Sequence, residues 1–335
     1  LDRALAGMQT HLGLKKIDAM IISHLHGDHF LLGEHLRTKY GAQIWTLDRI
    51  ADKCEHPARY DYAAMLPSYN SGIDRLAIDR RLRDGEVVEW EGYRLQLDWM
   101  PGQTEFGCCL WLELDDLRVA FTGDNIFGDP SDAQQDGHEA VVARNSAVFE
   151  EGYLYAAEYL KRLKPDLLIG GHSFVMPKPT EFINRYHRWA QDIIRIYQDL
   201  LPGPDYRYGF DPYWVKAKPY RVRLEPGQSA KVQLVVRNFR TRDQSHQIRV
   251  CTPPGITARP DVLEGVVASE SRRSFPVRLS ATADVQPGVN LAAFDITLDG
   301  QRYGQWFDRI VQITSPSAFP SHEAERGRIA PKPLY

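Results

Sequence analysis

The pattern of secondary structure changes completely about two thirds of the way along this chain of 335 residues. Up to residue 201, short apolar strands such as 166–171 interleave with stretches of helical periodicity such as 179–201, which is typical of layered α/β domains. We expect two of the helices to end at Gly13 and Gly41, and a further helix from about 146 to 164. Two hairpins are predicted, with turns at 91–92 and 115–116. From 220 to 314, alternating strands are separated by Pro and Gly turns and no helical period occurs. The sequence therefore predicts two domains of different fold class.

The boundaries of the predicted domains follow from this change. We expect an α/β domain at 1–201, a linker rich in Pro, Gly and Tyr at 202–219, and an all-β sandwich at 220–314. The sandwich is predicted to be immunoglobulin-like, without the cysteine pair of antibody domains. Residues 315–335 contain four prolines and are predicted to form a disordered tail.

Composition excludes several classes of protein. No run of 18 or more apolar residues occurs, so no membrane span is predicted. The four cysteines form no CxxC pair, which indicates neither a disulfide framework nor a thiolate metal site. Residues 1–214 contain 33 Asp and Glu against 23 Lys and Arg, whereas residues 215–315 contain 9 against 15. Because the acidic first part would repel polyphosphate, nucleic acid is a poor candidate substrate.

Three histidines and an aspartate lie within six residues of one another, between a predicted strand at 19–23 and a predicted helix at 30–41. Side chains two apart on an extended segment point to the same side, so His24 and His26 can hold one metal ion. Asp28 and His29 follow where the chain turns into the helix, and they can face a second ion. A polar loop with a capping aspartate and solvated histidines is the alternative.

The stretch SHLHGDH resembles the HxHxDH motif of the metallo-β-lactamase superfamily, and further segments follow in the order of that family. FTGD supplies Asp124, GGHS supplies His172, and the segment 83–104 resembles the one that leads to the family's PGHT turn. The resemblance covers roughly residues 1–200. It implies an αββα sandwich with metals bound at the loop edge of two sheets. Family members open with strands before the first helix, so we expect this chain to begin inside the domain.

The resemblance also implies the metal ligands, with Zn²⁺ as the expected cofactor and two ions as the expected number. The first ion would be held by His24, His26, Asp124 and Gln103, and the second by Asp28, His29, Asp124 and His172. Gln103 departs from the family, which has a histidine at this position. An amide oxygen is a neutral and weaker donor than imidazole and is more usual on harder cations, so the first site is expected to be the uncertain one.

Hydrolysis is the chemistry that this ligand set implies. Two neighbouring ions lower the pKa of a shared water and stabilise the oxyanion that forms when a metal-bound hydroxide attacks. We therefore expect a metal-dependent hydrolase of a small ester, lactone, amide or related bond. Asp124 would bridge the ions, and Asp28 resembles the residue that orients the nucleophile and returns a proton to the leaving group. Loop residues that could line a pocket are Asn125, Phe127, His138, Arg144 and Asn145.

Two other functions stay open. Gln103 could mark a lost first site in a catalytically weakened metal-binding or scaffold protein, in which the β-sandwich does the binding. The protein could also be a mononuclear iron oxygenase of a sulfur substrate. We expect a small-molecule substrate, and the 47 residues between Asp124 and His172 leave no room for the large insertion of nucleic-acid-cleaving members. The appended sandwich suits contact with carbohydrate, a surface or another protein, and favours an exported bacterial enzyme over a cytoplasmic one.

Overall fold

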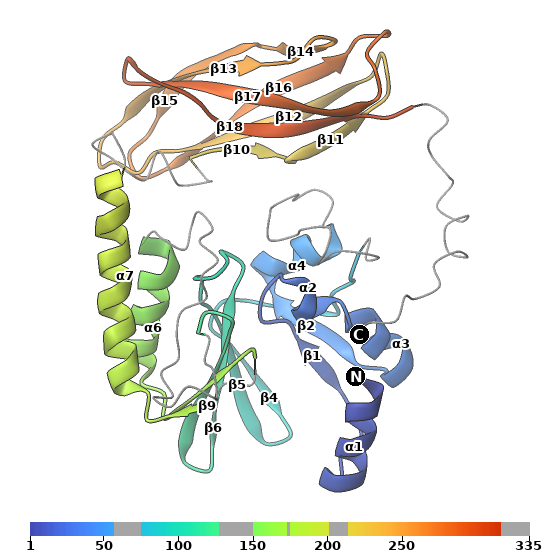
Figure 1. Ribbon diagram of the computed structural model, residues 1–335, viewed down its shortest axis with the longest axis vertical. Coiled ribbons are helices and arrows are strands. Elements are labelled where there is room, and N and C mark those ends of the chain that lie inside the picture. The colour runs from blue at the N-terminus through green and yellow to red at the C-terminus, as the bar shows by residue number, and fades with distance from the viewer. Residues whose placement is uncertain (57–74, 127–149, 173–174, 201–213, 316–335) are drawn as a thin grey trace. The chain divides into compact units, whose positions relative to one another are not determined.

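The computed structural model describes residues 1–56, 75–126, 150–172, 175–200 and 214–315. The chain divides into two compact units, Leu1–Asp211 and Pro212–Tyr335. This division falls inside the stretch 202–219 that is predicted to form a linker. Figure 1 shows that the first unit combines helices and strands, whereas the second contains strands.

A three-stranded parallel sheet with the order β1-β2-β3 forms one part of the first unit. Its strands are β1 (Ala19–Ile21), β2 (Gln43–Leu47) and β3 (Arg80–Leu82). The helices around it are α1 (Asp2–Leu12), α2 (Gly27–Phe30), α3 (Gly33–Tyr40) and α4 (Asp48–Glu55). Helices α1 and α3 end where Gly13 and Gly41 adopt left-handed backbone angles, with φ of 68° and 69°. Glycine adopts this conformation without a steric penalty, and so it ends both helices as the sequence predicts.

A six-stranded sheet with the order β4-β5-β6-β7-β8-β9 forms the other part. Its strands are β4 (Glu86–Trp90), β5 (Tyr93–Trp99), β6 (Cys108–Leu114), β7 (Leu117–Gly123), β8 (Leu167–Gly170) and β9 (Val175–Pro177). Two hairpins lie where the sequence predicts them. Their two-residue turns, Glu91–Gly92 and Asp115–Asp116, have positive φ at both positions, which matches the right-handed twist of the strands they join.

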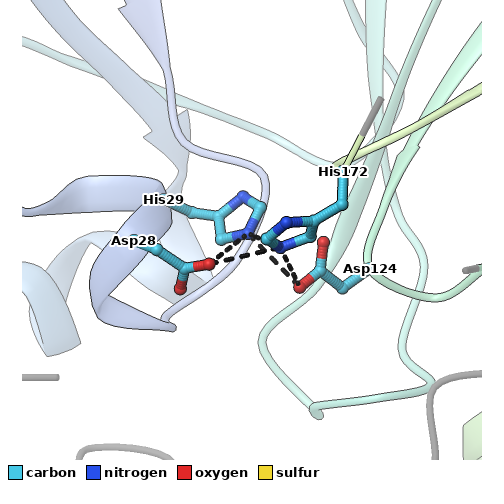
Figure 2. A group of neighbouring side chains, drawn as sticks. All are labelled: Asp28, His29, Asp124 and His172. Carbon is cyan, nitrogen blue, oxygen red and sulfur yellow. Dashed lines mark hydrogen bonds and ion pairs between the residues drawn. The ribbon is translucent and has the colours of Figure 1, made fainter. Parts of the chain in front are cut away.

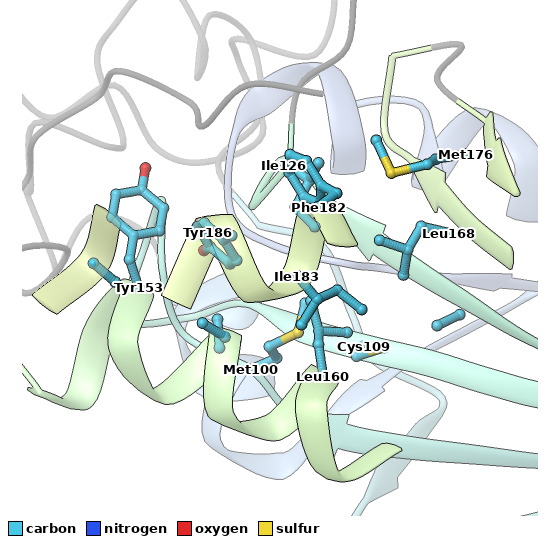
Figure 3. Packing of buried hydrophobic residues seen from close by; sticks show 14 residues of the cluster. Met100, Cys109, Ile126, Tyr153, Leu160, Leu168, Met176, Phe182, Ile183 and Tyr186 are labelled. Carbon is cyan, nitrogen blue, oxygen red and sulfur yellow. The ribbon is translucent and has the colours of Figure 1, made fainter. Parts of the chain in front are cut away.

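The helices α6 (Tyr155–Leu163) and α7 (Thr180–Leu200) pack on the six-stranded sheet. Figure 3 shows their contact with the sheet, where Leu160 and Ile183 meet Cys109. The neighbouring residue Cys108 points to the opposite face and packs in the core shared with the three-stranded sheet. Because successive residues of a strand face opposite sides, this one strand joins both cores. The layers are therefore helix, sheet, sheet and helix, as the resemblance to the metallo-β-lactamase superfamily implies.

The predicted helix from about 146 to 164 differs from the structure. Helix α6 begins at Tyr155, and the preceding turn η3 (Glu150–Leu154) contains Gly152 with φ of −124° and ψ of −126°, which are not helical angles. Glycine has a low helix propensity, so the chain bends at this point at little cost. The part of the predicted helix at 146–149 lies outside the described residues.

The second unit consists of two sheets, with the orders β10-β12-β16-β14 and β11-β18-β17-β13-β15. The strands are β10 (Val215–Lys218), β11 (Arg221–Leu224), β12 (Ser229–Arg237), β13 (Gln244–Cys251), β14 (Ile256–Arg259), β15 (Val262–Val267), β16 (Arg272–Ala281), β17 (Gly288–Leu298) and β18 (Gln301–Ile313). Buried and exposed residues alternate along them, as along β13. The described part of the second unit, 214–315, thus contains strands and no helix, which agrees with the predicted all-β domain, and its immunoglobulin-like type stays a prediction.

The linker prediction of 202–219 extends too far. Strand β10 occupies 215–218 and pairs with β12, because Val215 and Ala217 alternate with more exposed neighbours and enter the core. Such a short alternation next to Pro219 gives little signal in the sequence. The predicted tail lies outside the described residues from 316 onward. Among the helices in the described ranges, none is both long enough and apolar enough to cross a membrane.

Candidate metal centre

The predicted ligands of the first unit come together at one edge of its sheets. The segment His24–His29 closely follows β1 and forms the start of α2, while Asp124 follows β7 and His172 follows β8 closely. Strands β7 and β8 run parallel, so the residues after them emerge at the same edge. The fold therefore joins residues that lie far apart in the sequence: the side chains of His29 and His172, 143 positions apart, lie 3.3 Å apart at Nε2.

Asp28, His29, Asp124 and His172 form what we call the second group (Figure 2). Nε2 of His29 lies 3.3 Å from Oδ2 of both Asp28 and Asp124. Nε2 of His172 lies 3.2 Å from Oδ2 of Asp28 and 3.3 Å from Oδ2 of Asp124. Five of the six distances within this group are therefore 3.2–3.3 Å, and all four ligand atoms lie within 4.8 Å of one another. The second group is thus compact enough to hold one metal ion.

His24, His26, Gln103 and Asp124 form the first group, and all four side chains are buried. Nε2 of His24 lies 3.1 Å from Nδ1 of His26 and 3.5 Å from Oδ2 of Asp124. The carboxamide of Gln103 reaches the same oxygen, with Nε2 at 3.5 Å. Asp124 is therefore shared by the two groups, and its Oδ2 is the point on which both converge.

Two buried oxygen atoms in the first group have no hydrogen-bond partner among the described residues. They are Oδ1 of Asp124 and Oε1 of Gln103. A buried acceptor without a partner costs about 1–3 kcal/mol, and more when it is charged. A bound cation would relieve this cost, so the donor set and its two unpaired oxygens fit a metal centre.

Burial and hydrogen bonding shift the pKa values of this cluster. For Asp124, burial alone would raise the pKa, but hydrogen bonds from His24 and His29 outweigh it and hold the pKa well below the usual range. Burial lowers the pKa of His24. For His29, burial opposes the charged form, yet the hydrogen bond and charge of Asp124 leave the pKa raised. The cluster thus offers an ionised carboxylate and, at His24, the neutral imidazole that binds metals.

Ser23 contributes to the centre, although it is not among the residues predicted from the sequence. Its hydroxyl oxygen lies 3.1 Å from Nδ1 of His24 and 3.4 Å from Nδ1 of His29. With a cation bound, both rings would carry their proton on Nδ1 and donate it to this oxygen, which would leave the Nε2 lone pairs for the cation. The available signal was a hydroxyl residue directly before the first histidine.

Asn125 is buried, with 4% of its surface exposed, and its side chain binds the backbone. Its Oδ1 accepts a hydrogen bond of 2.8 Å from the N–H of Gln103, and its Nδ2 donates to the carbonyls of Met100 and Pro101. Asn125 therefore holds the loop that carries Gln103, rather than lining a pocket as the sequence suggested. The other predicted pocket residues, Phe127, His138, Arg144 and Asn145, lie outside the described residues.

Gly171 provides close approach in the second group. A Cβ atom at this position would lie 2.2 Å from Oδ1 of Asp124 and 2.8 Å from Cε1 of His29. Both distances are far below van der Waals contact. The residue before His172 therefore has to lack a side chain if His172 is to lie beside Asp124 and His29.

Comparison with known families decides the identity of the first unit. Residues 2–172 match the sequence profile of the Metallo-beta-lactamase superfamily. This chain belongs to that superfamily. The match to the superfamily ends at His172, the last residue of the second group. The second unit of this metallo-β-lactamase superfamily member lies beyond the match.

Solved structures of the superfamily are similar to this chain at low identity. A metallo-beta-lactamase family protein from Thermus thermophilus is 19% identical, with 63% of this chain and 75% of that chain covered and a TM-score of 0.45. A beta-lactamase from Chitinophaga pinensis is 15% identical, with 58% and 80% covered and a TM-score of 0.44. A metallo-beta-lactamase from Pontibacter korlensis is 15% identical, with 57% and 76% covered and a TM-score of 0.40. Membership of the superfamily therefore rests on the profile match.

Proposed function

We propose that this protein is a metal-dependent hydrolase that holds two Zn²⁺ ions and cleaves a small ester, lactone, amide or related bond. The observation that carries the proposal is the convergence of two groups of donor atoms on Oδ2 of Asp124. Imidazole nitrogen and carboxylate oxygen are the usual ligands of catalytic zinc. Membership of the superfamily supports a metal-dependent hydrolase of this kind.

The residues would divide the work as follows. His24, His26, Gln103 and Asp124 would hold one cation, and Asp28, His29, His172 and Asp124 the other. When bound, a pair of divalent cations lowers the pKa of a water molecule and stabilises negative charge on the substrate oxygen. Asp124 supplies the negative charge that both groups share. Ser23 orients His24 of the first group and His29 of the second through contacts with their Nδ1 atoms.

Asp28 is the candidate for moving a proton. Its side chain is 44% exposed, whereas that of Asp124 is 4% exposed, so Asp28 is the carboxylate that a substrate can approach. Its contacts with His29 and His172 run through Oδ2. Oδ1 can therefore take a proton from the attacking water and return it to the leaving group.

The test is the metal content of the purified protein, measured by plasma mass spectrometry beside turnover of chromogenic ester and lactone probes. We expect two zinc ions per chain and measurable hydrolysis. Asp124→Asn should lose metal and activity together, because it removes the charge that both groups share. Two ions retained in Asp124→Asn would overturn the assignment. One ion or none in the wild type without turnover would support the scaffold function instead, and iron with oxygen consumption would support the oxygenase.

Asp98 offers a matched control. It is also a buried carboxylate, but its oxygens accept hydrogen bonds from Trp111 Nε1 at 2.9 Å, Tyr159 Oη at 2.6 Å and Gln96 Nε2 at 2.9 Å. Asp98→Asn should lower the stability of the first unit and leave the metal content at the wild-type value. The two variants together separate loss of metal from loss of fold.

Three further predictions from the sequence concern the second unit and the location of the protein. They are the immunoglobulin-like type of the sandwich, its contact with carbohydrate, a surface or another protein, and export from the cell. All three stay predictions, as does a small molecule rather than nucleic acid as the substrate.

A further inference from the structure

We propose that the two metal sites are unequal, with the second group filling first, and that Asn125 positions Gln103 as the oxygen ligand of the weaker first site. This inference rests on the proposed function, because it assumes that both groups bind a cation. It goes beyond that function by assigning an order of loading and a role to Asn125.

The carboxamide of Gln103 lies where a ligand of the first group has to be. Its Nε2 is 3.5 Å from Oδ2 of Asp124, which is the limit of a hydrogen bond, so little holds the amide in this orientation. Rotation of the amide by half a turn exchanges its oxygen and nitrogen and brings Oε1 to the position that faces Asp124. A separation of 3.5 Å is close to the roughly 3.4 Å between neighbouring ligands of a tetrahedral ion. The unpaired Oε1 of Gln103 is therefore able to act as the fourth donor.

The side chain of Asn125 fixes the backbone of the loop that carries Gln103. Asn125 makes three hydrogen bonds to it, of 2.8 Å from Gln103 N–H, 2.9 Å to the carbonyl of Met100 and 3.1 Å to that of Pro101. A Cβ atom on Gly102 would lie 2.4 Å from Oδ1 of Asn125, so glycine permits this close contact. Asn125 also directly follows Asp124, which ties the position of Gln103 to that of the shared carboxylate.

The two groups differ in charge. Apart from the shared Asp124, the second group contains the carboxylate of Asp28, whereas the first group contains the neutral amide of Gln103 in the corresponding role. Each group contains two histidines. A carboxylate attracts a divalent cation more strongly than an amide oxygen does, because it carries a full negative charge. The second group should therefore bind its cation more tightly, and the first group should load last and release its cation first.

The experiment is a titration of metal-free protein with Co²⁺, followed by its visible absorption, and with Zn²⁺ in competition with a chromophoric chelator. We expect two binding steps that differ at least tenfold in affinity. Gln103→His should tighten the weaker step at least tenfold, and Gln103→Ala should weaken it at least tenfold. Neither variant should shift the tighter step by more than about threefold, since Gln103 belongs to one group only.

Asn125→Ala tests the positioning role, because it should weaken the same step tenfold to a hundredfold. In the Gln103→Ala background it should have no further effect, since a residue that acts through Gln103 has nothing left to position. Asn238 is the matched control in the second unit: it is also buried, and its side chain binds the backbone of Arg240, Arg242 and Val267. Asn238→Ala should change neither step.

The outcomes separate this inference from the proposed function. Two steps of equal affinity that Gln103→Ala leaves unchanged would overturn the inference and leave the hydrolase proposal standing. Weakening of the tighter step by Gln103→Ala, with the weaker one untouched, would overturn the order of loading. An additive loss in the Asn125→Ala and Gln103→Ala double variant would overturn the role of Asn125. A single ion bound by every variant would overturn the inference and the two-zinc proposal together.

Discussion

Each unit contains a buried site with unpaired polar atoms, and the two sites differ in their surroundings. In the first unit, Gln103 Oε1 and Asp124 Oδ1 lack partners among the described residues, and both belong to a cluster of donors that share one carboxylate. In the second unit, all three guanidinium nitrogens of Arg309 lack partners within the same ranges, and the side chain is 0% exposed. No comparable cluster of metal-binding side chains surrounds Arg309 in the described part of the chain.

This difference teaches how to interpret an unpaired buried group. Unpaired acceptors that converge with imidazole nitrogens form a site whose missing partner is a cation, and their cost is recovered when it binds. An isolated unpaired cation recovers nothing, and so it lowers the stability of its unit. A binding site is therefore distinguished by several ligand atoms that point to one position, and an unpaired buried atom alone does not indicate one.

Removal of metal should have the largest effect, and it should act on the first unit alone. A cation present at a thousand times its Kd stabilises the fold that binds it by about 4 kcal/mol. We expect a chelator to lower the calorimetric transition of the first unit by a matching amount and to leave that of the second unchanged. Asp124→Asn should not respond to the chelator. A fall of both transitions, or of neither, would break the comparison.

Replacement of the isolated cation should have the next largest effect, with the opposite sign. Burial lowers the pKa of Arg309 to about 10, which reflects the unfavourable charged form. Arg309→Met should raise the free energy of unfolding of the second unit by about 1–4 kcal/mol, measured in urea. Arg302 is exposed and forms an ion pair with Asp295, so Arg302→Met is the control and should change stability by less than about 1 kcal/mol. A destabilised Arg309→Met would reveal a partner for this guanidinium.

Loss of the Ser23 hydroxyl should weaken the metal centre without removing a ligand. Groups that orient metal-binding histidines typically contribute tenfold to a hundredfold in affinity, or about 1.4–2.7 kcal/mol. Ser23→Ala should weaken both binding steps in a chelator competition, because Ser23 contacts one histidine of each group. Thr46 is a nearby buried hydroxyl that donates to the carbonyl of Ile22, so Thr46→Val should keep wild-type affinity. Weakening of only one step would sharpen the assignment to a single histidine.

The smallest expected effect is a pH dependence in the second unit. Burial lowers the pKa of His246 below its ordinary value of 6.5. The neutral ring with its proton on Nδ1 satisfies both neighbours, because Nε2 accepts from Trp214 Nε1 and Nδ1 donates to the carbonyl of Gln244, each at 3.3 Å. Below about pH 6.5 the unfolded chain binds a proton at His246 that the folded chain does not. The free energy of unfolding of the second unit should therefore decrease as the pH falls, by at most about 1.4 kcal/mol per pH unit.

His246→Gln tests this dependence, since glutamine can accept and donate in the same way but does not titrate. Unfolding of the second unit at pH 7.5 and pH 5.5 should show a smaller difference in the variant than in the wild type. An unchanged difference would show that another group is responsible.

Local patterns in the sequence predicted the layered α/β fold, the two hairpin turns and the glycines that end α1 and α3. These features depend on residues that are neighbours in the sequence, so the sequence is sufficient to predict them. The short strands β3, β9 and β10 were missed because they contain charged residues or proline in place of the apolar runs that mark the equally short β1 and β8. Their partners in the sheet, rather than their own residues, give them their conformation.

The candidate site shows the same limit. The residues of the HxHxDH segment are close in sequence, and their common direction follows from strand geometry. The hydrogen bond between Gln103 N–H and Asn125 Oδ1 joins residues 22 positions apart. The Ser23 hydroxyl contacts the rings of both His24 and His29 because α2 places His29 beside it. Such contacts depend on where the loops meet in space, and no spacing in the sequence encodes that position.

The lack of a side chain at Gly171 has a consequence for engineering. A library that varies the loop after β8 to change substrate preference would include this position by default, since it looks like an ordinary loop residue. Every substitution of Gly171 would add a carbon atom that clashes with Asp124 and His29, and the ligands of the second group would have to move apart. Such a library should keep Gly171 and His172 together as one unit and place its diversity elsewhere.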